Sequence, residues 1–312
     1  MSMTTRDRIF KWPLIGSVAR WAHRITLYEG LTLYELLEIY IVGLGRSAVN
    51  NRSKAIAFSF FMALFPFALF ILNLIPFIPI DHFQEDFLRF VADSVPPNTY
   101  DAISGIINDI LNHSYGSLLS SGFLLSIFLQ ANGVNAILTA FENALPHHAK
   151  RPFLPQYIVA LGISFSLNIL LIVTVCIILV FEVFVQQTRL QDVVSDRIPL
   201  LQLGRYAFLI LMVLIVTSGL FKFGTKQLEK RPFISVGSVF TTILFGMTSY
   251  LFGIWVVRFS RYNELYGSIG TLLIVMFYIW INCTILLLGF ELNNVIEEHK
   301  QKIRRSKQTA DT

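Results

Sequence analysis

Polar side chains recur at helical spacing within one apolar stretch of this sequence, and their types suit ion or proton chemistry. They share one helix face because they follow at intervals of three or four residues: Asn132, Asn135, Thr139 and Glu142, with Asn143 next to the last. If this stretch crosses a bilayer, each polar group is costly unless it is paired or wet, so such residues point to a pathway. Glu142 and Glu291 supply carboxylates that could bind a cation or relay a proton.

Other apolar stretches carry similar polar residues. Ser59, Pro66 and Asn73 follow at seven-residue spacing, and Pro66 would bend its helix. Asn168 lies in a third stretch and Asn282 in the last one. Two interpretations stay open. In the first, these residues are hydrogen-bond partners between helices, each contributing roughly 0.6 kcal/mol. In the second, they line a polar pathway bounded by several helices.

The sequence offers little for enzymatic catalysis or metal binding. Its six histidines are scattered, and neither His-Glu-x-x-His nor a Gly-rich nucleotide loop occurs. Cys176 and Cys283 lie far apart inside apolar stretches, so they make neither a disulfide framework nor a metal motif. We therefore expect no catalytic residues, no bound metal and no cofactor. We also expect that the chain is not an enzyme and has no nucleic-acid partner.

The elements that must position these residues are membrane-spanning helices. Of the 312 residues, 54% are hydrophobic and 14% are charged, whereas soluble domains carry about 25% charged residues. A spanning helix needs about 20 apolar residues. Six stretches meet this need, at 55–80, 110–141, 152–181, 199–221, 232–257 and 265–290. The predicted fold is all-α: a polytopic membrane helix bundle with six transmembrane helices and further amphipathic interfacial helices.

Basic residues predict the orientation of the bundle. Most of the 25 Lys and Arg residues lie in the terminal regions and in the loops that six spans would place on the same side. The positive-inside rule puts this side, with both termini, in the cytoplasm. We expect a cytoplasmic N-terminal region at 1–54 with an interfacial amphipathic helix, and a transmembrane domain at 55–296. The latter includes an outer amphipathic segment at 81–114, and a basic cytoplasmic tail follows at 297–312.

Four stretches carry a family resemblance: 55–66, with its Ser and Pro; 135–143, followed by Arg-Pro-Phe; 259–270; and 288–293, which reads Leu-Gly-Phe-Glu-Leu-Asn. Together they resemble the YihY/virulence factor BrkB family, bacterial inner-membrane proteins that have been labelled ribonuclease BN-like. The resemblance implies a multi-pass protein of the bacterial plasma (inner) membrane with a role in export, the envelope or virulence. It also marks these loop residues as family motifs: Arg151, Tyr262, Gly267, Ser268 and Gly270.

These observations favour a transporter or exporter of an ion or an amphipathic envelope molecule. The alternative is a non-transporting envelope scaffold or accessory protein, with the acidic segment 81–114 as its contact surface. A membrane-associated ribonuclease is the weakest hypothesis, because a nuclease normally gathers acidic or His ligands around a metal. The expected partners are the lipid bilayer, a lipid or ion substrate, and either envelope proteins or further copies of this chain.

Overall fold

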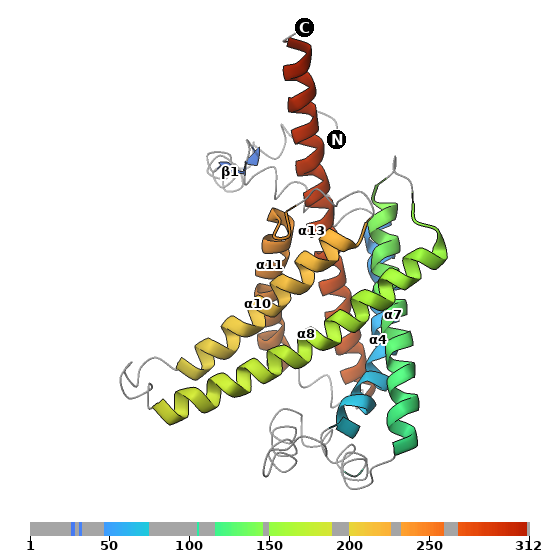
Figure 1. Cartoon of the computed structure of the whole chain (residues 1–312), viewed down its shortest axis with the longest axis vertical. Helices are drawn as coiled ribbons and strands as arrows, with labels where there is room; N and C mark the ends of the chain where they lie inside the picture. The colour runs from blue at the N-terminus through green and yellow to red at the C-terminus, as the bar shows by residue number, and fades with distance from the viewer. Residues whose placement is uncertain are drawn as a thin grey trace.

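The structure is a computed structural model that describes residues 26–28, 31–32, 47–74, 105, 116–145, 150–188, 200–225, 232–258 and 268–310. The long helices in these ranges are α4 (Ser47–Leu74), α7 (Gly116–Asn143), α8 (Phe153–Thr188), α10 (Leu200–Phe223), α11 (Val236–Arg258) and α13 (Ser268–Ala310) (Figure 1). A small antiparallel hairpin of β1 (Thr26–Tyr28) and β2 (Leu31–Thr32) precedes them.

The helices form where the sequence is apolar and nearly free of charge, because a chain inside lipid must satisfy its backbone polar groups within each segment. Within the described residues, α7, α8, α10, α11 and α13 are the 5 helices long and apolar enough to cross a membrane. The side chains of α4 are described only as far as Pro66, so a sixth crossing at 55–80 stays a prediction. Most of the N-terminal region and of segment 81–114 lies outside the described residues.

Helix α13 is longer than its apolar segment. It has 43 residues and continues to Ala310, whereas its apolar window ends at Glu298. The helix therefore passes the predicted tail boundary at 297 without a break, and its final turns project from the bundle (Figure 1).

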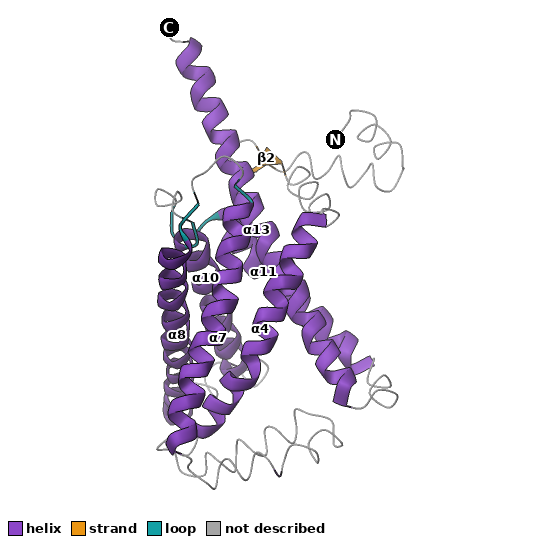
Figure 2. Cartoon of the chain, turned by 90° about the vertical axis from the view of Figure 1, so that its right-hand side faces the viewer, coloured by secondary structure: helices purple, strands orange, loops and turns teal. Residues whose placement is uncertain are grey.

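The six long helices pack in a closed circuit. Each contacts the next in the order α4, α7, α8, α10, α11 and α13, and α13 returns to α4. Figure 1 shows α8 and α10 running together away from α4 and α7. Figure 2 shows α11 and α13 diverging from α7 and α8 in another direction. The bundle thus consists of three helix pairs, α4 with α7, α8 with α10, and α11 with α13, which meet at one end and spread apart at the other.

The core lies at the end where the pairs meet, which we call the converging end. The first turns of α4, α8 and α11 lie there beside the last turns of α7 and α10. Most fully buried side chains gather at this end, including Ile56, Leu138 and Leu288, each with 0% exposure. Toward the other end, large apolar side chains such as Val180 and Leu251 are exposed. That distribution suits helices whose outer faces contact lipid.

Candidate functional site

The polar face of α7 is hydrogen-bonded to α8. The Nε2 of Gln156 donates to Oδ1 of Asn135 at 3.0 Å and to Oγ1 of Thr139 at 2.8 Å. Farther from the converging end, Nδ2 of Asn168 donates to Oε1 of Gln130 at 2.8 Å. The structure therefore places Asn135, Thr139 and Asn168 in hydrogen bonds between helices. The sequence patterns did not single out Gln156, which is 7% exposed. The signal that could have found it is an amide side chain near the start of a charge-free apolar stretch.

A second polar group joins the loop between α7 and α8 to the end of α7. The carboxylate of Glu142, 7% exposed, accepts the backbone N–H of Arg151 at 3.2 Å. The side-chain oxygen of Asn143 accepts Nζ of Lys150 at 2.6 Å, and its backbone carbonyl accepts Nη2 of Arg52 at 3.0 Å. The Arg52 contact is favourable because the last carbonyls of a helix lack intrahelical partners and attract cations. Together these contacts hold the starts of α4 and α8 against the end of α7.

Arg151 extends this connection to a fourth helix. Its Nη1 donates to the backbone carbonyl of Phe223 at 3.1 Å, at the end of α10. The family resemblance identified Arg151 as a motif residue but assigned it no role. In the structure it ties the loop between α7 and α8 to α10 and places a positive charge at the negative end of that helix.

Three phenylalanines from different helices close the converging end, and we call them the aromatic seal: Phe141 of α7, Phe221 of α10 and Phe290 of α13. Phe141 and Phe290 stack with ring centroids 4.0 Å apart and an interplanar angle of 7°. Phe221 meets both edge-on, at 5.7 and 5.9 Å. A Cβ at Gly224 would lie 2.8 Å from the ring of Phe141, so only glycine leaves room for this ring.

The motif 288–293 joins α13 to α11. Gly289 packs against Gly237 and Thr241, where an added Cβ would overlap the Thr241 hydroxyl. The Oδ1 of Asn293 accepts the backbone N–H of Gly237 at 2.8 Å, and its Nδ2 donates to Oγ of Ser235 at 2.9 Å. The first N–H groups of a helix have no intrahelical acceptor, so Asn293 supplies one from the neighbouring helix. These two motif residues therefore set how closely α11 approaches α13.

The structure describes only some of the remaining predicted residues. Ser59 and Asn282 bond carbonyls of their own helices, at Ala55 and Tyr278. Pro66 and Gly270 are buried, whereas Asn132 and Glu291 are half-buried. Tyr262 and Gly267 lie outside the described residues, as do the side chains of Asn73 and Ser268. Within the described part of the chain, His, Cys, Asp and Glu form no group of three that could hold a metal.

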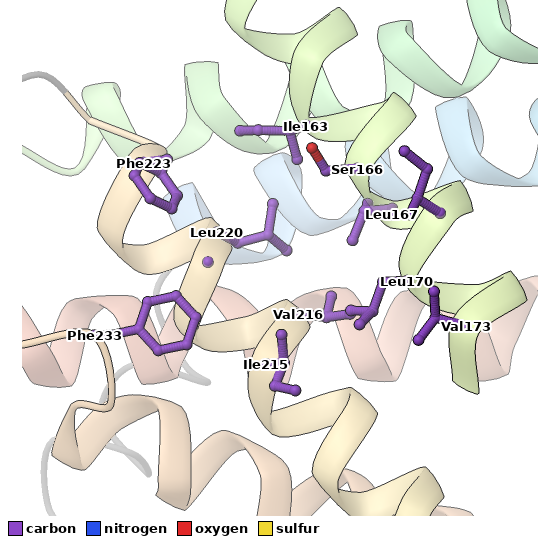
Figure 3. A pocket seen from close by; sticks show the side chains of 12 residues that line it. Ile163, Ser166, Leu167, Leu170, Val173, Ile215, Val216, Leu220, Phe223 and Phe233 are labelled. Carbon is purple, nitrogen blue, oxygen red and sulfur yellow. The ribbon is translucent and has the colours of Figure 1, made fainter. Parts of the chain in front are cut away.

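A groove of about 400 Å³ runs between α8 and α10 (Figure 3). Its walls are almost wholly apolar, with residues such as Leu167 and Leu170 from α8 and Val216 from α10. Ser166 is its polar exception, and its hydroxyl donates to the Gly162 carbonyl at 2.8 Å. The carbonyl of Phe223, a lining residue, is the group that Arg151 binds, so one end of the groove lies beside a guanidinium.

Comparisons with known proteins show which family this chain resembles. The sequence profile of the family described as Virulence factor BrkB matches residues 41–312. The chain is 30% identical over 274 residues to the Putative ribonuclease-like protein YfkH of Bacillus subtilis, covering 86% of this chain and 96% of that protein. It is 23% identical over 253 residues to a UPF0761 membrane protein of Coxiella burnetii, covering 78% and 87% respectively. No solved structure matches the chain.

Proposed function

The chain belongs to the virulence factor BrkB family, and from that premise we propose that it transports an amphipathic molecule of the bacterial envelope across the inner membrane. It is a membrane protein with several apolar helices. Transport of a substrate and the substrate's amphipathic character are our inferences from the geometry of the bundle.

The observation that carries the proposal is the difference between the two ends of the bundle. At the converging end, the aromatic seal and the hydrogen bonds of Arg151 hold the helix pairs together. At the other end, the pairs spread apart (Figures 1 and 2). A bundle closed on one side and spread on the other is the form expected of one state of a transporter. In such proteins, one helix bundle rocks against another to change the side of access.

The charge distribution supports an orientation for this state. Arg52, Lys150, Arg151 and Lys222 all lie at or beside the converging end. The positive-inside rule favours the cytoplasm for the side that carries them. We therefore propose that the converging end and both termini face the cytoplasm, and that the structure represents a state closed toward the cytoplasm.

The packing favours an amphipathic substrate over an ion. A path for ions needs polar groups that can replace the ion's water. Asn135, Thr139 and Asn168 are instead engaged in hydrogen bonds between α7 and α8. The groove between α8 and α10 offers an apolar surface that leads to the basic converging end. An apolar tail and an anionic head would match these two surfaces.

Lipid translocation in proteoliposomes tests the proposal. Vesicles would contain the purified full-length protein and phosphatidylglycerol labelled with a fluorophore that dithionite bleaches from outside. We expect protein-dependent translocation, seen as bleaching beyond the outer-leaflet fraction, and none in protein-free vesicles. Equal bleaching in both would reject lipid transport. Co-purification of envelope proteins without any translocation would favour the scaffold alternative.

The name of the Bacillus relative contains the word ribonuclease-like. For this chain, we propose that it is not a ribonuclease. Catalytic metal sites need gathered acidic or His ligands. Glu142, one of the carboxylates at this end, is engaged with the Arg151 backbone instead.

A further inference from the structure

We propose that the groove between α8 and α10 is a binding site for one anionic phospholipid, with an acyl chain in the groove and its phosphate bound by Arg151 and Lys222. This proposal holds whether or not the protein transports lipid. A lipid that stays bound and a lipid that is transported would make the same contacts in the groove. It accounts for an apolar groove that ends beside two cationic side chains.

The size and lining of the groove fit an acyl chain. Its volume of about 400 Å³ falls within the range of roughly 300–1,000 Å³ for small-molecule sites. Along α8 the lining extends from Ile163 to Val173, which corresponds to about 15 Å of helix. The site is therefore elongated and apolar. Figure 3 shows the side chains of Leu167, Leu170 and Val216 converging on it from the two helices.

Lys222 lies on the groove side of α10, close to its end. Ile215 and Gly219 line the groove, and Lys222 follows them by seven and three residues. These intervals put all three residues on one helix face, with Lys222 about one turn nearer the helix end than Gly219. Lys222 is half-buried. Its long aliphatic stem can follow the apolar wall while the charged group reaches the membrane surface.

Arg151 stands at the same end from the α8 side. Its Nη1 binds the Phe223 carbonyl at 3.1 Å. A guanidinium carries five N–H donors, which is more than one carbonyl can accept. Glu142, the nearby carboxylate, contacts the backbone N–H of Arg151. The guanidinium therefore has donors for a phosphate oxygen, and Arg–phosphate pairs are among the strong charge-assisted contacts.

The charge of this end selects the lipid class. Two basic side chains beside an apolar groove complement a phosphate whose headgroup carries no compensating positive charge. Phosphatidylglycerol has this property and phosphatidylcholine does not. Basic residues near a membrane surface each contribute attraction to anionic lipids. We therefore expect the site to distinguish the two lipids by headgroup while using the same acyl chains.

Native mass spectrometry of the full-length protein in detergent tests the site. The protein would be titrated with dioleoylphosphatidylglycerol or dioleoylphosphatidylcholine. We expect one phosphatidylglycerol to bind saturably and more tightly than phosphatidylcholine. Lys222→Gln should weaken phosphatidylglycerol binding about fivefold, the effect of one basic residue near the surface, and leave phosphatidylcholine unchanged. Arg151→Gln should act alike, but it also removes a hydrogen bond within the fold.

A matched pair of glycine substitutions tests the groove itself. A Cβ at Gly219 or at Gly246 meets no atom within 4 Å, so both positions have room at the first side-chain atom. Gly219 lines the groove, whereas Gly246 lies on α11. Gly219→Leu should weaken phosphatidylglycerol binding on the order of tenfold. This is the loss expected when about two methylene groups of the acyl chain are displaced from the groove. Gly246→Leu should leave binding as in the wild type.

Three results would overturn the proposal. They are equal affinity for the two lipids, unchanged binding in Gly219→Leu, and many weakly bound lipids without saturation. Because the readout is binding, a protein that fails to translocate lipid can still confirm this site.

Discussion

The contact between α11 and α13 predicts a specific cost for adding one methyl group at Gly289. A Cβ there would overlap Oγ1 of Thr241 and would lie 3.2 Å from Cβ of Thr241 and from the carbonyl oxygen of Gly237. Thr241 lies on α11 and is fully buried, so its side chain has little room to move aside. The helices must therefore separate, and overpacking of this kind costs about 1–3 kcal/mol.

Gly246 supplies the matched control on the same helix pair. A Cβ there meets no atom within 4 Å. Replacing glycine by alanine in a helix interior stabilises it by roughly 0.5–1 kcal/mol, and this gain applies to both positions. Gly246→Ala should thus stabilise the fold by about 0.5–1 kcal/mol. Gly289→Ala should destabilise it by up to about 2.5 kcal/mol, because the overlap outweighs the helix gain.

A second substitution identifies the cause of the cost. The hydroxyl of Thr241 is buried and makes no hydrogen bond within the described part of the chain. Thr241→Ala should therefore remove the overlapping oxygen cheaply and restore most of the stability lost in Gly289→Ala. The assay is SDS-driven unfolding in mixed micelles, followed by far-ultraviolet circular dichroism. Equal stability of Gly289→Ala and Gly246→Ala, or a double variant without recovery, would refute the close contact.

Three further predictions concern the polar groups. Gln156→Met should destabilise the fold by roughly 1 kcal/mol, because it removes the hydrogen bonds to Asn135 and Thr139; an unchanged thermal midpoint in detergent would contradict these bonds. Glu142→Gln should leave both the thermal midpoint and translocation in proteoliposomes close to wild type, since a glutamine oxygen can still accept the Arg151 N–H; loss of translocation at an unchanged midpoint would show that the carboxylate itself takes part. The purified protein should leave RNA uncut in the presence of Mg²⁺, and metal-dependent cleavage that survives repurification would overturn our view of the ribonuclease label.

The apolar stretches of the sequence predicted the helices. A chain inside lipid must satisfy its backbone hydrogen bonds internally, and this leaves few alternatives to a helix. The predicted stretches at 199–221 and 232–257 match α10 and α11 closely. The apolar stretches did not predict where α13 ends. Residues from 297 onward are polar, but Glu, Lys, Gln and Arg dominate them and are good helix formers. Extending an existing helix is also far easier than starting one.

The candidate site was only partly accessible from sequence. Helical spacing grouped Asn135 and Thr139, but it could not name Gln156, which is 21 and 17 residues away on another helix. The aromatic seal gave no local signal, because 28 phenylalanines occur in the chain and only tertiary packing brings three of them together. The same holds for the convergence of the helix pairs, which depends on contacts such as that of Arg151 with Phe223.

A reversible cross-link at the converging end tests most directly whether this end must open. The hydroxyl oxygens of Thr217 on α10 and Thr242 on α11 lie 3.3 Å apart. Cysteine sulfurs in their place need only a small shift to reach the disulfide length of about 2 Å. The two sites join different helix pairs, and Cys176 and Cys283 would be replaced by alanine.

Lipid translocation by this double-cysteine variant would be measured before oxidation, after oxidation and after reduction. Separation of the helix pairs at the converging end predicts that the disulfide stops translocation and that reduction restores it. A cross-linked protein, verified by mass, that translocates as fast as its reduced form would contradict the account.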